Sequence, residues 1–204
     1  MSGKVYIASM KFRGKHATPI CKSPYIKVNV TSCQAKNNVD RIVFSPMTEV
    51  EDGYKGYYNF ESYWQSGKVF QGIPIEETKK FWRNVREPKK RYPKSKNKKV
   101  LYAKFDDYKD KMDYITSRKL VYVTNYYQFI KYEERVEYLK NRLKEGDNIV
   151  IYDLDGPKDD NNDVICLELT NELLINKIND IRHPFGHGYI VGATIAGIKP
   201  KKYT

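Results

Sequence analysis

Asn148–Leu154, "NIVIYDL", is the stretch that decides the fold class. Its Ile, Val and Tyr residues form a short apolar run between polar residues, which is typical of a buried strand. Two alternating stretches, Lys4–Phe12 and Tyr25–Thr31, predict further strands, as do the short runs Arg41–Ser45 and Val164–Thr170. The sequence therefore predicts a small sheet.

Helical patterns occupy more of the chain than strands do. Asn59 is a good N-cap for a helix over Phe60–Phe70, and Gly72 can terminate that helix. Neither internal repeats nor a second domain are visible. We therefore expect one compact α+β domain over residues 1–204, mostly helical with a small sheet. The other expected helices cover residues 75–87, 108–118, 121–145, 171–181 and 188–198.

The chain is strongly basic. It holds 37 Lys and Arg residues against 25 Asp and Glu, a net charge of +12. This balance is typical of proteins with a polyanionic partner, such as a nucleic acid, and a generic lysine-rich surface is an equal alternative. The segment Arg86–Lys99 has eight Lys or Arg residues and two prolines. It predicts a loop insertion whose Lys89, Lys90, Arg91 and Lys94 contact DNA or RNA; the alternative is a solvated insertion.

The cysteines and the hydropathy indicate the cellular setting. Cys21, Cys33 and Cys166 are odd in number and widely spaced, so neither a disulfide framework nor a metal knuckle is expected. No apolar run approaches the roughly 18 residues of a membrane span, and the N-terminus lacks a signal-peptide core. We expect an intracellular protein, cytoplasmic or, in a eukaryotic or viral setting, in the nucleus or a viral factory. No membrane partner, metal or cofactor is expected.

The expected helix at Phe60–Phe70 carries a polar stripe. Glu61, Gln65 and Lys68 fall on one helical face, with Trp64 beside them. An ordinary exposed Glu/Lys stripe is one interpretation. However, a Trp is poorly suited to open solvent, and a glycine at Gly67 costs the helix about 1 kcal/mol. Both features favour a face that a ligand or a neighbouring backbone approaches closely.

Glu61–Phe70, "ESYWQSGKVF", is similar to the Glu-x-x-x-Gln-x-x-Lys segment of the NADAR superfamily. This is the N-glycosidase fold of riboflavin-pathway glycosidases and guanine-ADP-ribose hydrolases. Asn29–Ser32, Arg41–Pro46 and His183–His187 look like a poorly characterised branch of that group, and the order and spacing match over most of the chain. The usual Ser-Asn-Phe turn is absent at Phe44–Met47, and "GHGYIVGATIAGI" replaces the usual Gly-x-Asn-x-Leu-Gly pattern.

The resemblance implies hydrolysis of a ribosyl–base or ADP-ribosyl–base bond in a phosphorylated substrate, and it supports a catalytic lysine at Lys68. That lysine would form an imine with an opened ribose if burial lowers its pKa. Glu61 would act as acid and base, Gln65 would bind the base or ribose, and Trp64 would stack on the base. In the alternative interpretation, Lys68 binds a phosphate and Glu61 only orients it. A non-catalytic nucleotide- or nucleic-acid-binding module is the alternative function.

Five further residues are candidates for substrate binding. Arg41, with Ser45 beside it, is suited to clamp a phosphate. Asp153, at the end of a strand, suits ribose hydroxyls or the role of a base. Arg182 is a further candidate for substrate binding, and His187 suits a contact with phosphate or the role of an acid. The alternatives are a surface arginine, turn chemistry and helix capping.

Overall fold

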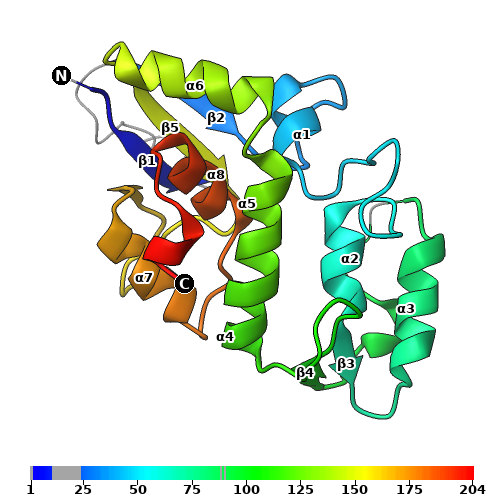
Figure 1. The fold of residues 1–204 in the computed structure, drawn as a ribbon. Helices are drawn as coiled ribbons and strands as arrows, with labels where there is room; N and C mark the ends of the chain where they lie inside the picture. The colour runs from blue at the N-terminus through cyan, green and yellow to red at the C-terminus, as the bar shows by residue number, and fades with distance from the viewer. Residues whose placement is uncertain (1, 11–23, 88, 90) are drawn as a thin grey trace. The chain divides into compact units, whose positions relative to one another are not determined.

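The computed structural model describes residues 2–10, 24–87, 89 and 91–204 (Figure 1). Residue contacts divide the chain into two compact units. Unit 1 comprises Met1–Ser45 and Val123–Thr204, and unit 2 comprises Pro46–Tyr122. Helices dominate and strands form a small mixed sheet, so the predicted α+β class is confirmed.

Unit 1 contains a four-stranded sheet in the order β2-β5-β1-β6. The strands β1 (Val5–Ser9) and β2 (Tyr25–Asn29) both pair parallel with β5 (Asn148–Asp153). The last strand, β6 (Cys166–Glu168), pairs antiparallel with β1. All four strands were expected, although each is shorter than its predicted range. Lys11 and Phe12, predicted to extend β1, lie outside the described residues.

The core of unit 1 forms around β5. Ile151 lies between Ile7 of β1 and Val28 of β2, and all three side chains are fully buried. The helix α8 (His187–Ile195) packs on β1 and β5 and is itself almost wholly buried. Its small and apolar residues allow this close packing, and the predicted buried helix is confirmed.

Two sequence predictions fail in the other helices of unit 1. The stretch Arg41–Ser45, predicted as a strand, belongs to the helix α1 (Val39–Phe44). The Asn38 side chain accepts a hydrogen bond from Arg41 N at 3.1 Å, so an N-cap outweighs the β-branched composition. The long helix predicted over 121–145 is interrupted at residues 131–133. Its parts are the end of η3 (Arg118–Val123), α5 (Thr124–Ile130) and α6 (Glu134–Lys144).

The two remaining elements of unit 1 lie near its C-terminal end. The helix α7 (Asn171–Asn179) confirms the predicted helix over 171–181, and Thr170 caps it by accepting from Leu173 N at 3.1 Å. The short 3-10 helix η4 covers Pro200–Lys202. None of the helices within the described ranges combines the length and the apolarity needed to cross a bilayer.

Unit 2 corrects the prediction that one helix runs from Phe60 to Phe70. The helix α2 (Phe60–Ser66) ends one residue before Gly67, and β3 (Lys68–Phe70) follows at once. Asn59 is its N-cap, as predicted, because its side chain accepts from Ser62 N at 2.8 Å. The last three residues of the predicted helix instead pair antiparallel with β4 (Val100–Ala103), a strand that was not predicted.

The remaining helices of unit 2 are shorter than predicted. The helix α3 (Ile75–Asn84) packs on α2, and α4 (Tyr114–Ser117) begins only where Asp113 caps it, by accepting from Thr116 N at 2.7 Å. The predicted helix over 108–118 is therefore wrong in its first half. The described part of the basic segment is irregular except for the short 3-10 helix η2 (Pro93–Ser95), which agrees with the predicted loop.

Candidate functional site

Lys68 is the first residue of β3, and its side chain is half-buried. Its Nζ lies 5.7 Å from the centroid of the Trp64 ring. Within the described ranges its amine makes no hydrogen bond or ion pair. Burial lowers the pKa of Lys68 below its ordinary value; the Glu61 carboxylate opposes this shift and the Arg91 charge adds to it. At any given pH, Lys68 therefore has a larger share of neutral amine than an exposed lysine.

The structure brings Glu61, Gln65 and Lys68 together, but not on one helical face. Glu61 and Gln65 lie on α2, where Gln65 Nε2 donates a hydrogen bond to Glu61 Oε1 at 2.6 Å. Lys68 approaches them from β3, near enough for the Glu61 charge to act on its amine. The predicted grouping is correct, and the predicted geometry is wrong because the chain turns at Gly67.

Lys68 borders a pocket of about 240 Å³ within unit 2. This is below the roughly 300–1,000 Å³ of typical small-molecule sites, so it has room for a single ring or sugar but not for a whole nucleotide. Most of its walls were not predicted from the sequence, although the apolar run "VLYA" at Val100–Ala103 is a signal for one of them. The other lining residues are Trp64, Phe105, Asp113, Tyr114 and Ser117.

The ring of Trp64 is largely covered. It is 8% exposed and stacks on Phe105 with 5.8 Å between centroids and 15° between planes. Tyr114 lines the same pocket and is 47% exposed, so it offers more ring surface for stacking than Trp64 does. A Cβ on Gly67 would overlap the Phe105 ring. The close approach that explains this glycine is therefore an aromatic side chain of the chain itself.

Asp153 and His187 form a second polar group, in unit 1. Asp153 is 2% exposed, and its Oδ2 accepts from Gly188 N at 2.7 Å and lies 3.5 Å from His187 Nδ1. The Nε2 of His187 lies 2.8 Å from the carbonyl oxygen of Val30 and therefore donates to it. A carboxylate at the start of α8 is favourable because the helix dipole is positive there. This arrangement favours helix capping, one of the alternatives raised by the sequence.

Space around Asp153 is restricted. A Cβ built on Gly186 or Gly188 would lie 2.5 Å or 2.8 Å from Asp153 Oδ2. Both positions must therefore be glycine for the carboxylate to reach the helix start.

The other candidates of unit 1 hold local contacts. Arg41 Nη1 donates to the carbonyl oxygen of Gln34 at 2.5 Å, and Ser45 is buried at the C-terminus of α1. Arg182 Nε pairs with Asp180 Oδ1 at 3.0 Å and holds the pKa of that carboxyl well below its usual range. These three residues belong to unit 1, whereas the Lys68 pocket is built within unit 2.

The basic segment is partly neutralised. Lys89 pairs with Glu87 at 3.3 Å, and Lys94 pairs with Glu77 at 2.5 Å. Lys90 lies outside the described residues. The charge of Arg91 acts on the Lys68 amine. Of the three predicted nucleic-acid contacts that the structure describes, Arg91 is thus the one whose charge acts on the Lys68 amine.

In the described part of the chain, no three His, Cys, Asp or Glu side chains gather where they could hold a metal ion. Comparisons with family models, with curated proteins and with solved structures found no match to this chain. The function of this chain is therefore inferred from the residues and geometry of the Lys68 pocket.

Proposed function

We propose that this chain is an N-glycosidase of the NADAR kind, which hydrolyses a ribosyl–base or ADP-ribosyl–base bond with Lys68 as its nucleophile. One observation carries the proposal: a lysine whose pKa is lowered by burial borders a ring-sized pocket, with the Glu61 carboxylate acting on its amine. Nucleophilic lysines are activated in this way, because the neutral amine is the reactive form.

The chemistry follows from these two side chains. The neutral Lys68 amine forms a bond to C1′ of the ribose while the bond from C1′ to the base breaks. The proton released by the attacking nitrogen passes by way of the Glu61 carboxylate to the departing base. The ribose ring then opens to give an imine between Lys68 and C1′. Water hydrolyses this imine, and the free sugar and the free amine are restored.

The surroundings of the pocket suit a nucleotide. Gln65, bonded to Glu61, fixes the carboxylate, and the partly exposed Tyr114 ring offers a stacking surface. Arg91 supplies positive charge for a phosphate. The overall charge of +12 favours a nucleic-acid-linked substrate such as ADP-ribosylated guanine over a free riboflavin precursor.

The test is to incubate the protein with ADP-ribosylated DNA, with free nucleotides derived from NAD and with pyrimidine-riboside phosphates. Mass spectrometry then follows the released base. We expect release from one of these substrates by the wild type and by Lys27→Met, and none above background by Lys68→Met. Lys27 is a matched control because its Nζ lies 5.9 Å from the Tyr25 ring centroid but its side chain is exposed. Equal release by Lys68→Met would refute the proposal.

The alternative is a non-catalytic module that binds a nucleotide or a nucleic acid, and the basic segment favours it. Such a module would release no base and would lose DNA affinity when Arg91 is replaced by Ala. A phosphate contact by Arg91 contributes about 0.9 to the slope of log affinity against log salt. An unchanged slope in Arg91→Ala removes the support for this alternative.

We also propose that the chain acts inside the cell. The odd and widely spaced cysteines support this, and of those described Cys33 is exposed and Cys166 is buried. Recovery of either residue in a disulfide from native protein would contradict it.

A further inference from the structure

The ring of Phe105 is a wall shared by two pockets of unit 2. On one side is the pocket of about 240 Å³ that Lys68 borders. The second pocket has a volume of about 290 Å³ and is lined by Tyr57, Tyr63 and Lys79 among others. Phe105 lines both pockets and is 2% exposed, so its position limits the size of each.

The position of Phe105 depends on the turn at Gly67. Because Gly67 has no side chain, the Phe105 ring enters the space where a Cβ would stand. There it stacks on Trp64 and lies 5.4 Å from the Tyr63 ring, between centroids. The backbone is tied at the same point, since Lys104 N donates to the carbonyl oxygen of Gly67 at 2.8 Å.

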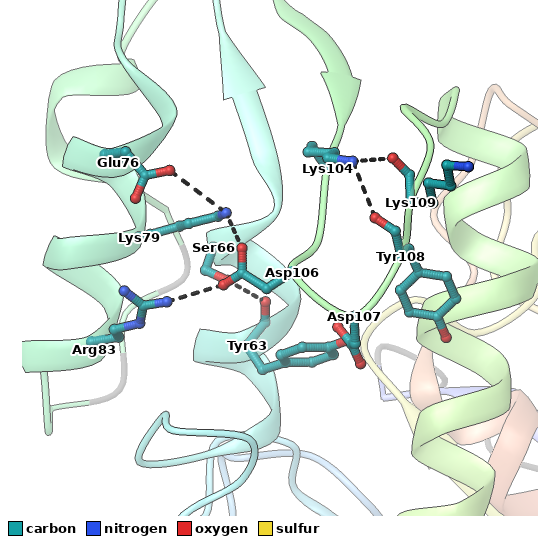
Figure 2. A network of polar contacts seen from close by, with 10 residues as sticks. All are labelled: Tyr63, Ser66, Glu76, Lys79, Arg83, Lys104, Asp106, Asp107, Tyr108 and Lys109. Atoms are coloured by element: carbon teal, nitrogen blue, oxygen red, sulfur yellow. Dashed lines mark hydrogen bonds and ion pairs between the residues drawn. The ribbon is translucent and has the colours of Figure 1, made fainter.

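Two aspartates directly after Phe105 anchor the segment that carries its ring (Figure 2). Asp106 pairs with Lys79, and it also accepts from Arg83 at 3.0 Å, both on α3. The Lys79 side chain is 7% exposed, so water screens this pair less than a surface pair. Glu76 lies 3.8 Å from the same amine.

Asp107 is held by partners that do not belong to α3. It accepts from the Tyr63 hydroxyl of α2 at 2.9 Å and pairs with Lys55. These bonds lower the pKa of Asp107 despite its partial burial. We call Asp106 and Asp107, with these partners, the aspartate clamp. Figure 2 shows Lys79 and Arg83 pointing to Asp106, and the Asp107 side chain beside the Tyr63 ring.

From this arrangement we infer that Phe105 is the size-selecting wall of the Lys68 pocket, and that the aspartate clamp keeps it there. The group that reaches the Lys68 amine is then no larger than one ring, such as a ribose. A fused ring system has to stay at the mouth, where Leu101 and Tyr114 are 52% and 47% exposed. The inference rests on the proposed function only in taking Lys68 as the reacting amine.

The first test uses two aldehydes with cyanoborohydride as the hydride donor. Lys68 and an aldehyde lose water to form an imine, and the hydride reduces it to a stable secondary amine that peptide mass spectrometry detects. We expect glycolaldehyde to label Lys68 in the wild type and in Phe105→Ala at rates within about twofold. We expect 2-naphthaldehyde to label it at least tenfold faster in Phe105→Ala. A naphthaldehyde rate unchanged by the substitution, or equal to that of glycolaldehyde in the wild type, overturns the inference.

A second readout does not depend on the reactivity of Lys68. Binding of 2-naphthol, a neutral two-ring compound, is followed by quenching of Trp fluorescence, with Trp64→Phe identifying the responding ring. We expect at least tenfold tighter binding to Phe105→Ala than to the wild type, and equal affinity overturns the inference. If naphthol discriminates but no aldehyde labels Lys68, the proposed nucleophile fails while the inference about Phe105 stands.

Phe105→Ala removes a buried ring and can unfold unit 2, so a milder variant is needed. Asp106→Asn combined with Asp107→Asn loosens the clamp while Phe105 remains. We expect the naphthaldehyde rate to rise about threefold in this variant. Glu77→Gln is the matched control, because it breaks the ion pair with Lys94 in the same unit without touching the clamp. A rise in the control equal to that in the double variant contradicts the inference.

Discussion

Asp153 in unit 1 is buried and Lys68 in unit 2 is half-buried, and the surroundings of these two ionisable side chains differ. The Asp153 carboxylate accepts from a backbone N–H at the start of α8 and lies beside an imidazole. The Lys68 amine has no hydrogen-bonding partner among the described residues and borders a pocket. A buried charge that is satisfied within the chain stabilises the fold, whereas a desolvated amine facing a pocket remains available for chemistry.

After Lys68→Met, the substitution Glu61→Gln is expected to lower the rate of base release most. The amide cannot carry the proton from Lys68 to the base, so we expect the rate of base release to fall by about 10²- to 10⁴-fold. The hydrogen bond with Gln65 is retained in form, so the fold persists. The measurement is the initial rate at saturating substrate, with Glu77→Gln as the control. A loss of less than threefold would leave Glu61 with only a structural role.

Asp153→Ala tests whether the buried Asp153 carboxylate stabilises the fold of unit 1. It leaves the buried Gly188 N–H without an acceptor and removes the negative charge from the start of α8. We expect the free energy of unfolding to fall by about 1–3 kcal/mol, measured by urea denaturation. Asp153→Asn keeps an acceptor at the same place and should lose less than half as much. Unchanged stability of Asp153→Ala combined with lost base release would instead make Asp153 part of the active site.

The smallest expected effect is a difference in pH dependence between lysines. Burial lowers the pKa of Lys68, whereas the hydrogen bond to Glu168 raises the pKa of Lys4. Since only the neutral amine reacts, raising the pH from 7 to 10 should label Lys68 with glycolaldehyde at a lower pH than Lys4. Peptide mass spectrometry at each pH gives the order. Labelling of Lys4 before Lys68 would show that Lys68 is not the activated amine.

Local signals predicted several elements well. The run "NIVIYDL" contains β5, one of the two inner strands, and "GYIVGATI" lies in a buried helix. An apolar composition directs such segments to the core whether they form a strand or a helix. Asn59 caps α2 as expected, since capping needs only residues within the same turn. The strand predicted at Arg41–Ser45 failed because an equally local cap, at Asn38, was overlooked.

The site itself was only half predictable. Glu61, Gln65 and Lys68 were chosen correctly as neighbours, but on the assumption of one continuous helix. The helix ends at Ser66 because residues 68–70 find a pairing partner at residues 100–103. That pairing joins segments about thirty residues apart, and no periodicity within either segment records it.

The sequence by itself determined the fold class, the inner strand β5, several helix starts and the grouping of Glu61 with Lys68. Only the tertiary structure decided which of the polar candidates are satisfied by the fold and which face a pocket. It also decided that Phe105, brought beside Gly67 from a distant segment, forms the wall next to Lys68. The physical reason is that burial and electrostatic environment are properties of packed neighbours, whereas capping and strand propensity are properties of adjacent residues.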